Sequence, residues 1–291
     1  MNKKSIKIRF FVEYIIVKFL FIILSVLPIN IVSNLGGKIL KFLGPFSKQH
    51  ITAIKNYKRI FPNHSKKLRN QNISKSWENI GKNLFEISIL KKIVHNKKII
   101  IKGDNEIKLL LKRNQPTIFF GIHQSNWEIL VPLIDGLGFP LGAIYRHINN
   151  QYIDKIIFRK RTGSLKSNKS FYTPKGKKSA KDITEAIRNS LSMLVVIDQK
   201  DSSGEEVLFF KRKVKTQTGF LKLARKYKLP IIPIKNKRID NEKIELTFLE
   251  PFYHNDKNIS DNQMMETIHH KIEDWIKSEP SQWFWQHKRF S

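Results

Sequence analysis

From residue 99 to residue 278 the chain alternates short apolar runs with amphipathic stretches. Runs of four to eight apolar residues are typical of buried strands, and apolar residues at three- and four-residue spacing are typical of helices. Such alternation predicts an α/β fold with a central, mostly parallel sheet flanked by helices. The expected strands cover 99–101, 117–122, 141–145, 193–197, 207–210, 231–235 and 243–249. The expected helices cover 104–113, 125–137, 151–161, 180–190, 217–228 and 261–278.

Two further segments complete this outline. Residues 34–96 have a helical pattern that is interrupted at Phe61-Pro62-Asn63, which predicts two helices and a turn. Residues 163–181 are polar and basic, with glycine and proline among them, so we expect a mobile loop that borders the functional site. No repeat or low-complexity linker divides the chain, and its 291 residues suit one main domain, expected at 34–291.

The N-terminal residues 1–33 have a different character. Residues 10–32 are apolar apart from Glu13 and Lys18, and the uninterrupted part, 19–29, is too short to cross a hydrocarbon layer of about 30 Å. A basic start precedes it, but no small-residue cleavage site follows, which disfavours a signal peptide. We expect a retained membrane anchor, either a marginal transmembrane helix or a helix that lies in the interface, with a buried core helix as the alternative.

Composition limits the chemistry and the partners. The chain contains 54 Lys and Arg against 24 Asp and Glu, a formal charge of +30, and it has no cysteine. Disulfides, thiolate metal sites and a cysteine nucleophile are therefore excluded. The basic surplus predicts attraction to nucleic acid, anionic lipid or an acidic protein, although a general bias toward lysine explains it equally well.

The segment GIHQSNWEIL, 121–130, is the strongest candidate for a functional site. The strand expected at 117–122 leads into His123, which places this imidazole at the carboxyl edge of the sheet, where α/β folds bind their ligands. Glu128 follows one helical turn later and could orient the ring of His123 as a general base. Alternatively, Ser125 and Glu128 match a capping box, which needs no chemistry. No second histidine stands at the spacing of a zinc-protease helix.

The residues from His123 to Glu128 resemble the H-x4-[DE] motif of the glycerolipid acyltransferase superfamily. Most of the chain resembles the lipid A biosynthesis acyltransferase family of the lauroyl/myristoyl type. The blocks that carry this resemblance are Asn56 with Phe61-Pro62, Tyr145-Arg146 with Asp154 and Arg159, Ile197-Asp198-Gln199, Phe209-Phe210 with Thr216 and Gly219, and the closing segment EPSQWFWQHKRF at 279–290. Two residues depart from the pattern, since Lys211 and Val214 stand where the family usually has glycine and alanine.

The resemblance implies a glycerol-3-phosphate-acyltransferase-like fold and transfer of a fatty acyl chain from acyl carrier protein to a hydroxyl of a lipid A precursor. It further implies a role in lipopolysaccharide biosynthesis at the cytoplasmic face of the cell inner membrane, without metal or other cofactor. In this reading His123 is the base and Glu128 holds its ring. Arg159 stabilises the oxyanion, with Arg161 as its substitute.

Other residues of these blocks have both a functional and a structural interpretation. Arg146 and Asp198 position substrate or form an internal ion pair that braces the sheet. His287 and Arg289 contact a substrate phosphate or pack the C-terminus. Trp283 and Trp285 touch lipid acyl chains or form a buried aromatic pair that closes the core, and the buried pair is favoured.

The expected partners are acyl carrier protein, a lipid A precursor and inner-membrane lipids, which are all anionic, whereas no nucleic-acid motif accompanies the charge. Two alternatives stay open. One is an acyltransferase for a glycerophospholipid, glycolipid or amino-acid lipid, and the other is an inactive, basic scaffold attached to the membrane.

Overall fold

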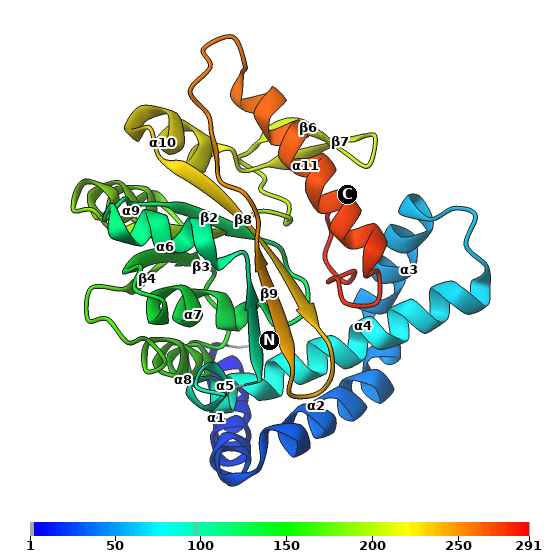
Figure 1. Cartoon of the computed structure of the whole chain (residues 1–291). Helices are drawn as coiled ribbons and strands as arrows, with labels where there is room; N and C mark the ends of the chain where they lie inside the picture. Colours follow the sequence, from blue (N-terminus) through cyan, green and yellow to red (C-terminus); the bar gives the residue numbers. More distant parts are fainter. Residues whose placement is uncertain (1–2, 97, 291) are drawn as a thin grey trace.

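The computed structural model describes residues 3–96 and 98–290 and is built around an eight-stranded sheet (Figure 1). Its strand order is β1-β9-β8-β2-β5-β3-β4, with β10 paired to β8. Neighbouring strands are parallel except for the pairs β8–β9 and β10–β8. The prediction of an α/β fold with a mostly parallel sheet is confirmed. The strands are β1 (Ile99–Lys102), β2 (Ile118–Gly121), β3 (Leu141–Tyr145), β4 (Phe171–Pro174), β5 (Ser192–Val196), β8 (Pro230–Arg238), β9 (Ile244–Phe248) and β10 (Phe252–Tyr253), and a separate antiparallel hairpin consists of β6 (Glu205–Phe209) and β7 (Arg212–Thr216).

Helices cover both faces of this sheet, in keeping with the burial of all four residues of β2. Ile118 and Phe120 point toward one hydrophobic cluster, which includes residues of α9, α10 and α11. Phe119 points to the other face, where it packs with residues of α6 and α7. Both faces of β2 are therefore buried, and this explains its continuous apolar sequence. The helices of these layers are α6 (Asp104–Lys112), α7 (Leu130–Gly136), α8 (Gln151–Thr162), α9 (Lys177–Arg188), α10 (Gly219–Tyr227) and α11 (Asp261–Ser278).

Most expected elements are present, and the exceptions have local causes. β4 lies within the segment 163–181 that was predicted to be a loop, because its pairing with β3 depends on a partner distant in sequence. β7 was also missed, since its lysines and arginine hide the alternation of Val214 and Thr216, which are buried. The helix expected at 125–137 begins as the 3-10 turn η3 (Trp127–Ile129).

The N-terminal part is a series of helices that precedes the sheet. It comprises α1 (Lys3–Val26), α2 (Ile29–Leu43), η1 (Gly44–Phe46), α3 (Lys48–Ile60), α4 (Lys66–Glu86), η2 (Ile87–Ile89) and α5 (Leu90–Val94). The break between α3 and α4 confirms the interruption predicted at Phe61-Pro62-Asn63. The boundary predicted at residue 33 falls inside α2.

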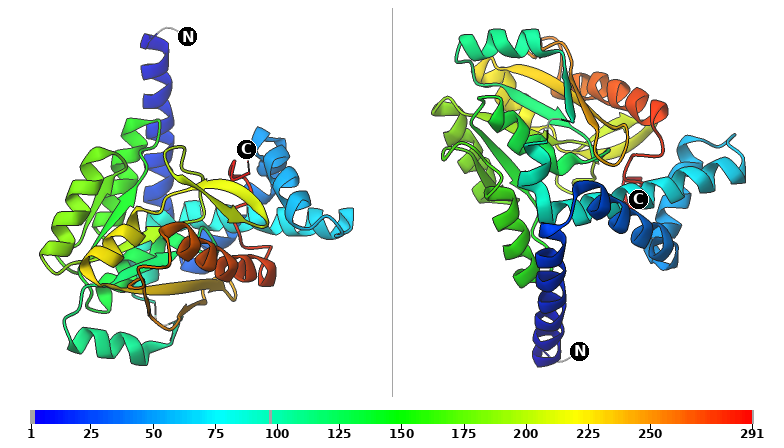
Figure 2. Two further views of the ribbon diagram at one scale, coloured as in Figure 1. Left: turned by 90° about the horizontal axis from the view of Figure 1, so that it is seen from above. Right: turned by 60° about the horizontal axis from the view of Figure 1, so that its bottom comes forward.

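Helix α1 projects from the body of the molecule with the N-terminus at its tip (Figure 2). Its last turns contact the protein through Phe21 and Leu24, which are buried, whereas much of its remaining apolar surface is exposed. Among the described residues, no helix combines the length and apolar character that crossing a bilayer requires, so the spanning form of the expected anchor is not found there.

Candidate active site

Strand register brings His123 and Asp198 together. Gly121 of β2 is paired with Val196 of β5, and the two strands run in parallel. His123 and Asp198 each stand two residues beyond this pair, so both lie at the carboxyl edge of the sheet. The amide of Ile197 donates to the carbonyl of Gly121 and keeps the two chains side by side at this point.

The imidazole of His123 contacts a polar group at each nitrogen. Nδ1 lies 2.7 Å from Oδ1 of Asp198, and Nε2 lies 3.0 Å from Nε2 of Gln199. Because the carboxylate accepts and the amide nitrogen donates, the ring carries its proton on Nδ1 and presents a lone pair at Nε2. That is the protonation state of a general base. The ring is 16% exposed, so a substrate hydroxyl can reach Nε2 when it displaces Gln199.

Asp198 is held as an anion in a buried position. It accepts from the backbone amide of His123 and, at 2.7 Å, from the indole Nε1 of Trp283. Burial alone would raise the pKa of this carboxyl, but the adjacent imidazole and these donors lower it to about 2. The carboxylate is therefore charged at neutral pH and can stabilise an imidazolium at His123.

Glu128 does not contact the imidazole as expected. Its carboxylate instead accepts two hydrogen bonds of 2.7 Å from Nε and Nη2 of Arg161. Burial alone would lower the pKa of Arg161, but the charge of Glu128 and its hydrogen bond raise it. The contact predicted between Glu128 and His123 is therefore wrong, because η3 turns the Glu128 side chain toward α8.

The capping-box alternative is also wrong. The residue at the N-cap of η3 is Asn126, whose side-chain oxygen accepts from the amide of Glu128 at 3.0 Å. Ser125 has a φ of +53°, a left-handed conformation that is uncommon for a residue with a side chain. The carbonyl of Ser125 accepts hydrogen bonds from the amides of Asn79 and Asn83 on α4.

A buried polar network anchors this loop to α4. Arg238 on β8 donates to both carboxylate oxygens of Glu86, at 2.8 and 2.7 Å, and Asn126 donates to the same carboxylate at 2.6 Å. Asn236 on β8 donates to the carbonyl of Asn126 at 2.7 Å. These buried hydrogen bonds join the loop to α4 and to β8, and they order the backbone next to His123.

The C-terminal segment after α11 forms another wall of the site. The amide of Phe284 donates to the carbonyl of His123 at 3.0 Å, and its ring lies 6.1 Å from the imidazole. Trp283 and Trp285 are both buried and meet edge to face at 4.6 Å, which confirms the favoured interpretation as an aromatic pair. Trp283 has an additional role, since it donates to Asp198.

Comparison with known proteins is informative at the level of family. A family model described as "Bacterial lipid A biosynthesis acyltransferase" matches residues 1–291. The chain belongs to this family. Membership supports acyltransferase activity and implies a lipid A precursor as substrate.

Two further comparisons, with solved structures and with curated sequences, assign no function to the chain. The crystal structure of the 1-acyl-sn-glycerophosphate (LPA) acyltransferase PlsC from Thermotoga maritima is similar, with 14% sequence identity and a TM-score of 0.40. The similarity covers 88% of this chain and 98% of that chain. No curated protein sequence matches the chain.

The arginines of the lipid A acyltransferase motifs occupy different environments. Arg161 is committed to Glu128, as described above, whereas Arg159 is exposed on α8. Arg159 lines a cavity of about 420 Å³ with Tyr145 and Phe158. His147 also lines this cavity and is paired with Asp154, at 2.6 Å from Nδ1 to Oδ2.

Arg146 does not form the internal ion pair that was its structural alternative. It is exposed, and Asp198 is engaged by His123 and Trp283 instead.

His287 and Arg289 have structural contacts. Nε2 of His287 accepts from the amide of Lys200 at 3.2 Å. Arg289 is 1% exposed and donates to the carbonyl of Gln199 at 3.1 Å and the hydroxyl of Thr216 at 2.7 Å. Burial lowers the pKa of Arg289 to about 10. The C-terminal packing interpretation of Arg289 is therefore confirmed, because a buried guanidinium with these partners is not placed to meet a phosphate.

The sequence motifs do not distinguish Gln199 and Trp283 as functional residues. Gln199 contacts the nitrogen of His123 that would take a proton, and Trp283 donates to Asp198. A positional signal for Asp198 was present in the sequence, since it follows an apolar strand just as His123 does. The carboxyl ends of adjacent parallel strands meet at one edge of a sheet. However, the sequence of neither strand indicates that β2 and β5 are neighbours.

Proposed function

We propose that this protein transfers a fatty acyl chain from the thioester of acyl carrier protein to a hydroxyl of a lipid A precursor. The observation that carries the proposal is the hydrogen-bonded pair of His123 and Asp198, which lies at the carboxyl edge of the sheet in a chain of the lipid A acyltransferase family. The pair has the base and the supporting carboxylate that acyl transfer to a hydroxyl needs.

The reaction follows from the protonation state of the ring. Nε2 of His123 accepts the proton of the acceptor hydroxyl as its oxygen attacks the thioester carbonyl carbon. The C–O bond forms, the tetrahedral oxyanion collapses, and the C–S bond breaks. The departing thiolate takes the proton from the imidazolium, so the products are an ester and the free thiol of acyl carrier protein. Throughout, the anion of Asp198 stabilises the imidazolium and holds the ring in one tautomer.

Stabilisation of the oxyanion is assigned to an arginine. Arg161 is held by two hydrogen bonds to Glu128, whereas Arg159 is exposed and lines a cavity. We therefore propose that Arg159 stabilises the developing negative charge. The ion pair of Glu128 and Arg161 holds η3 against α8. In this proposal Asp198, and not Glu128, is the carboxylate that supports His123.

The acyl donor and the location of the protein are parts of the same proposal. Acyl carrier proteins are acidic, and a formal charge of +30 favours encounter with an acidic protein and with anionic lipids. The exposed apolar side of α1 suits a helix that lies in a membrane interface. We place the protein at the cytoplasmic face of the inner membrane, where donor and acceptor meet.

A direct assay tests the proposal. Purified protein is incubated with radiolabelled acyl-acyl carrier protein and a tetraacylated lipid A precursor, and the labelled lipid is measured. His123→Ala should lower kcat by about 10²- to 10⁴-fold. The matched control is His270→Ala on α11, because His270 is 73% exposed and α11 carries neither residue of the dyad.

The acceptor is tested in parallel with a lysophospholipid in place of the precursor. Transfer to the precursor alone supports the proposal, and transfer to the lysophospholipid alone would reassign the acceptor. Equal background in wild type and His123→Ala would rule out catalysis by this site and favour a scaffold.

A further inference from the structure

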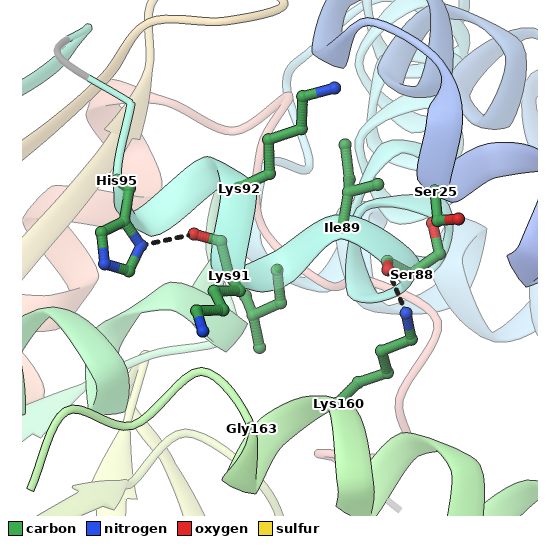
Figure 3. Close-up of a pocket in the computed structure, with 9 residues that line it drawn as sticks. Ser25, Ser88, Ile89, Lys91, Lys92, His95, Lys160 and Gly163 are labelled. Atoms are coloured by element: carbon green, nitrogen blue, oxygen red, sulfur yellow. Dashed lines mark hydrogen bonds between the residues drawn. The ribbon is translucent and has the colours of Figure 1, made fainter.

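A basic cavity lies where α1 meets the body of the protein. It has a volume of about 520 Å³, within the range of ligand pockets, and is separate from the His123 site. The lining comes from the end of α1, from η2 with α5, and from α8 (Figure 3). Its basic side chains are Lys91, Lys92, His95 and Lys160, and Ser25 and Ser88 add small polar groups.

These four basic side chains lack carboxylate partners among the side chains that the structure describes. Lys160 donates to the carbonyl of Ser88 at 2.7 Å, and Lys92 donates to the carbonyl of Leu27 at 2.9 Å. Each contact uses one of the three donors of an ammonium and leaves the charge uncompensated. Burial lowers the pKa of Lys160, which is the cost of holding a cation there without an anion.

His95 adds a ring nitrogen to the same cavity. Its Nδ1 lies 2.7 Å from the carbonyl of Lys91, and because a carbonyl can only accept, Nδ1 carries a hydrogen (Figure 3). Nε2 is then available to a ligand, as an acceptor when the ring is neutral and as a donor when it is charged. A cavity with this donor set matches the oxygens of a phosphate.

The exposed apolar residues of α1 indicate where such a phosphate would come from. They recur at three- and four-residue spacing, so they form one face of the helix. They are Ile8, Phe11, Val12, Ile15, Ile16, Phe19, Ile22, Ile23 and Val26. Ser25, which lines the cavity, lies between Ile23 and Val26 in the sequence, and its hydroxyl donates to the carbonyl of Ile22. The basic cavity therefore lies at the end of an apolar face.

We infer that this cavity binds the phosphate group of an anionic lipid while the apolar face of α1 lies in the acyl-chain boundary of the same membrane. The inference rests on the membrane association in the proposed function and extends it to a specific headgroup site. An amphipathic helix gains affinity from both buried apolar area and attraction to anionic lipid, and here the two parts are adjacent.

The test compares two triple variants with the same loss of charge. The cavity variant carries Lys91→Gln, Lys92→Gln and Lys160→Gln. The control variant carries Lys177→Gln, Lys178→Gln and Lys181→Gln on α9, whose residues are exposed and whose buried side packs on the opposite face of the sheet. Binding to vesicles of phosphatidylcholine, with and without phosphatidylglycerol, is measured as a partition coefficient by flotation.

The cavity variant should lose at least about tenfold in partition into phosphatidylglycerol vesicles, since one lysine near an anionic surface contributes roughly fivefold. The control variant should lose less than about threefold. An equal loss in both variants, or no loss in either, would overturn the inference. If the triple variant is poorly folded, Lys91→Gln with Lys92→Gln should repeat the loss at smaller amplitude, because both lysines are exposed.

A titration with inorganic phosphate separates the sources of the phosphate group. No binding of free phosphate, together with the vesicle result, assigns the cavity to a lipid headgroup. Saturable binding of free phosphate that disappears in the cavity variant shows that the cavity binds both free phosphate and a lipid phosphate group. Binding that persists in the cavity variant would place phosphate elsewhere and contradict the inference.

Acyl transfer in detergent micelles distinguishes this inference from the proposed function. The cavity variant should keep the wild-type kcat there, because His123 and Asp198 are intact and no anionic bilayer is present. Wild-type protein that binds phosphatidylglycerol vesicles but transfers no acyl chain would refute the proposed function alone.

Discussion

Asp198 and Glu128 are the two carboxylates that could support His123, and they have different partners. Asp198 comes from the end of β5 and contacts Nδ1 of the ring, whereas Glu128 comes from η3 and is paired with Arg161. The short separation of Glu128 from His123 in sequence does not produce a contact. A neighbouring parallel strand supplies the carboxylate because its end lies at the same edge of the sheet.

Substitution of these two carboxylates should separate their roles. Asp198→Asn removes the charge that stabilises the imidazolium and should lower kcat by about 10²- to 10⁴-fold. Glu128→Gln leaves the guanidinium of Arg161 without its anionic partner, so its main effect should be a lower Tm, with a smaller change in kcat. Both quantities are measured on each variant by the acyl transfer assay and by thermal denaturation.

The opposite result for these two variants would contradict the assignment of Asp198 as ring partner. A larger loss of kcat in Glu128→Gln than in Asp198→Asn, with Tm unchanged in both, would return Glu128 to the role of ring partner.

At the scale of elements, α2 and α4 touch through their backbones. A Cβ on Gly81 would overlap the carbonyl oxygen of Gly36, and a Cβ on Gly36 would overlap that of Gly81. Only glycine allows this approach of two helices. The contact matters for the site because α4 also carries Asn79, Asn83 and Glu86, which hold the loop beside His123.

Gly81→Ala should therefore destabilise the protein, by about 1–3 kcal/mol, because the helices must move apart to accept the methyl group. The control is Gly136→Ala at the end of α7, where an added Cβ meets nothing within 4 Å. That variant should be neutral or more stable by up to about 1 kcal/mol. Urea denaturation measures both, and equal stability of the two variants would show that α2 and α4 are not in close backbone contact.

At the scale of the whole molecule, the buried His269 and the half-buried His287 make stability depend on pH. Burial lowers the pKa of His269 to about 3 and that of His287 to about 4, from an ordinary value of 6.5. Between about pH 4 and 6.5 the unfolded chain therefore binds more protons than the folded chain. The stability that these residues contribute is present above pH 6.5 and is lost as the pH falls.

The free energy of unfolding should fall by about 1.4 kcal/mol per pH unit for each of the two histidines below pH 6.5. Urea denaturation at pH 7.5, 6 and 5 measures the slope. His287→Gln should reduce it, whereas His270→Gln, on the exposed side of α11, should leave it unchanged. A slope that is the same in all three proteins would contradict the assignment to His287.

Much of this structure follows from local pattern. The 2- and 3.6-residue periodicities located β2, β3, β5 and α11, because a side chain's own neighbours decide which face it can bury. The same reasoning placed His123 at the end of a strand and therefore at the edge of the sheet. The closing motif located the buried pair of Trp283 and Trp285.

Contacts between distant segments were decided only by the folded chain. The order of strands makes β5 the neighbour of β2, and this order brings Asp198 rather than Glu128 to the imidazole. The C-terminal segment then adds Trp283 to the same carboxylate. Periodicity describes one element and its environment, whereas strand order depends on the packing of all the layers at once, and for that reason the partner of His123 could not be read from its own neighbourhood in the sequence.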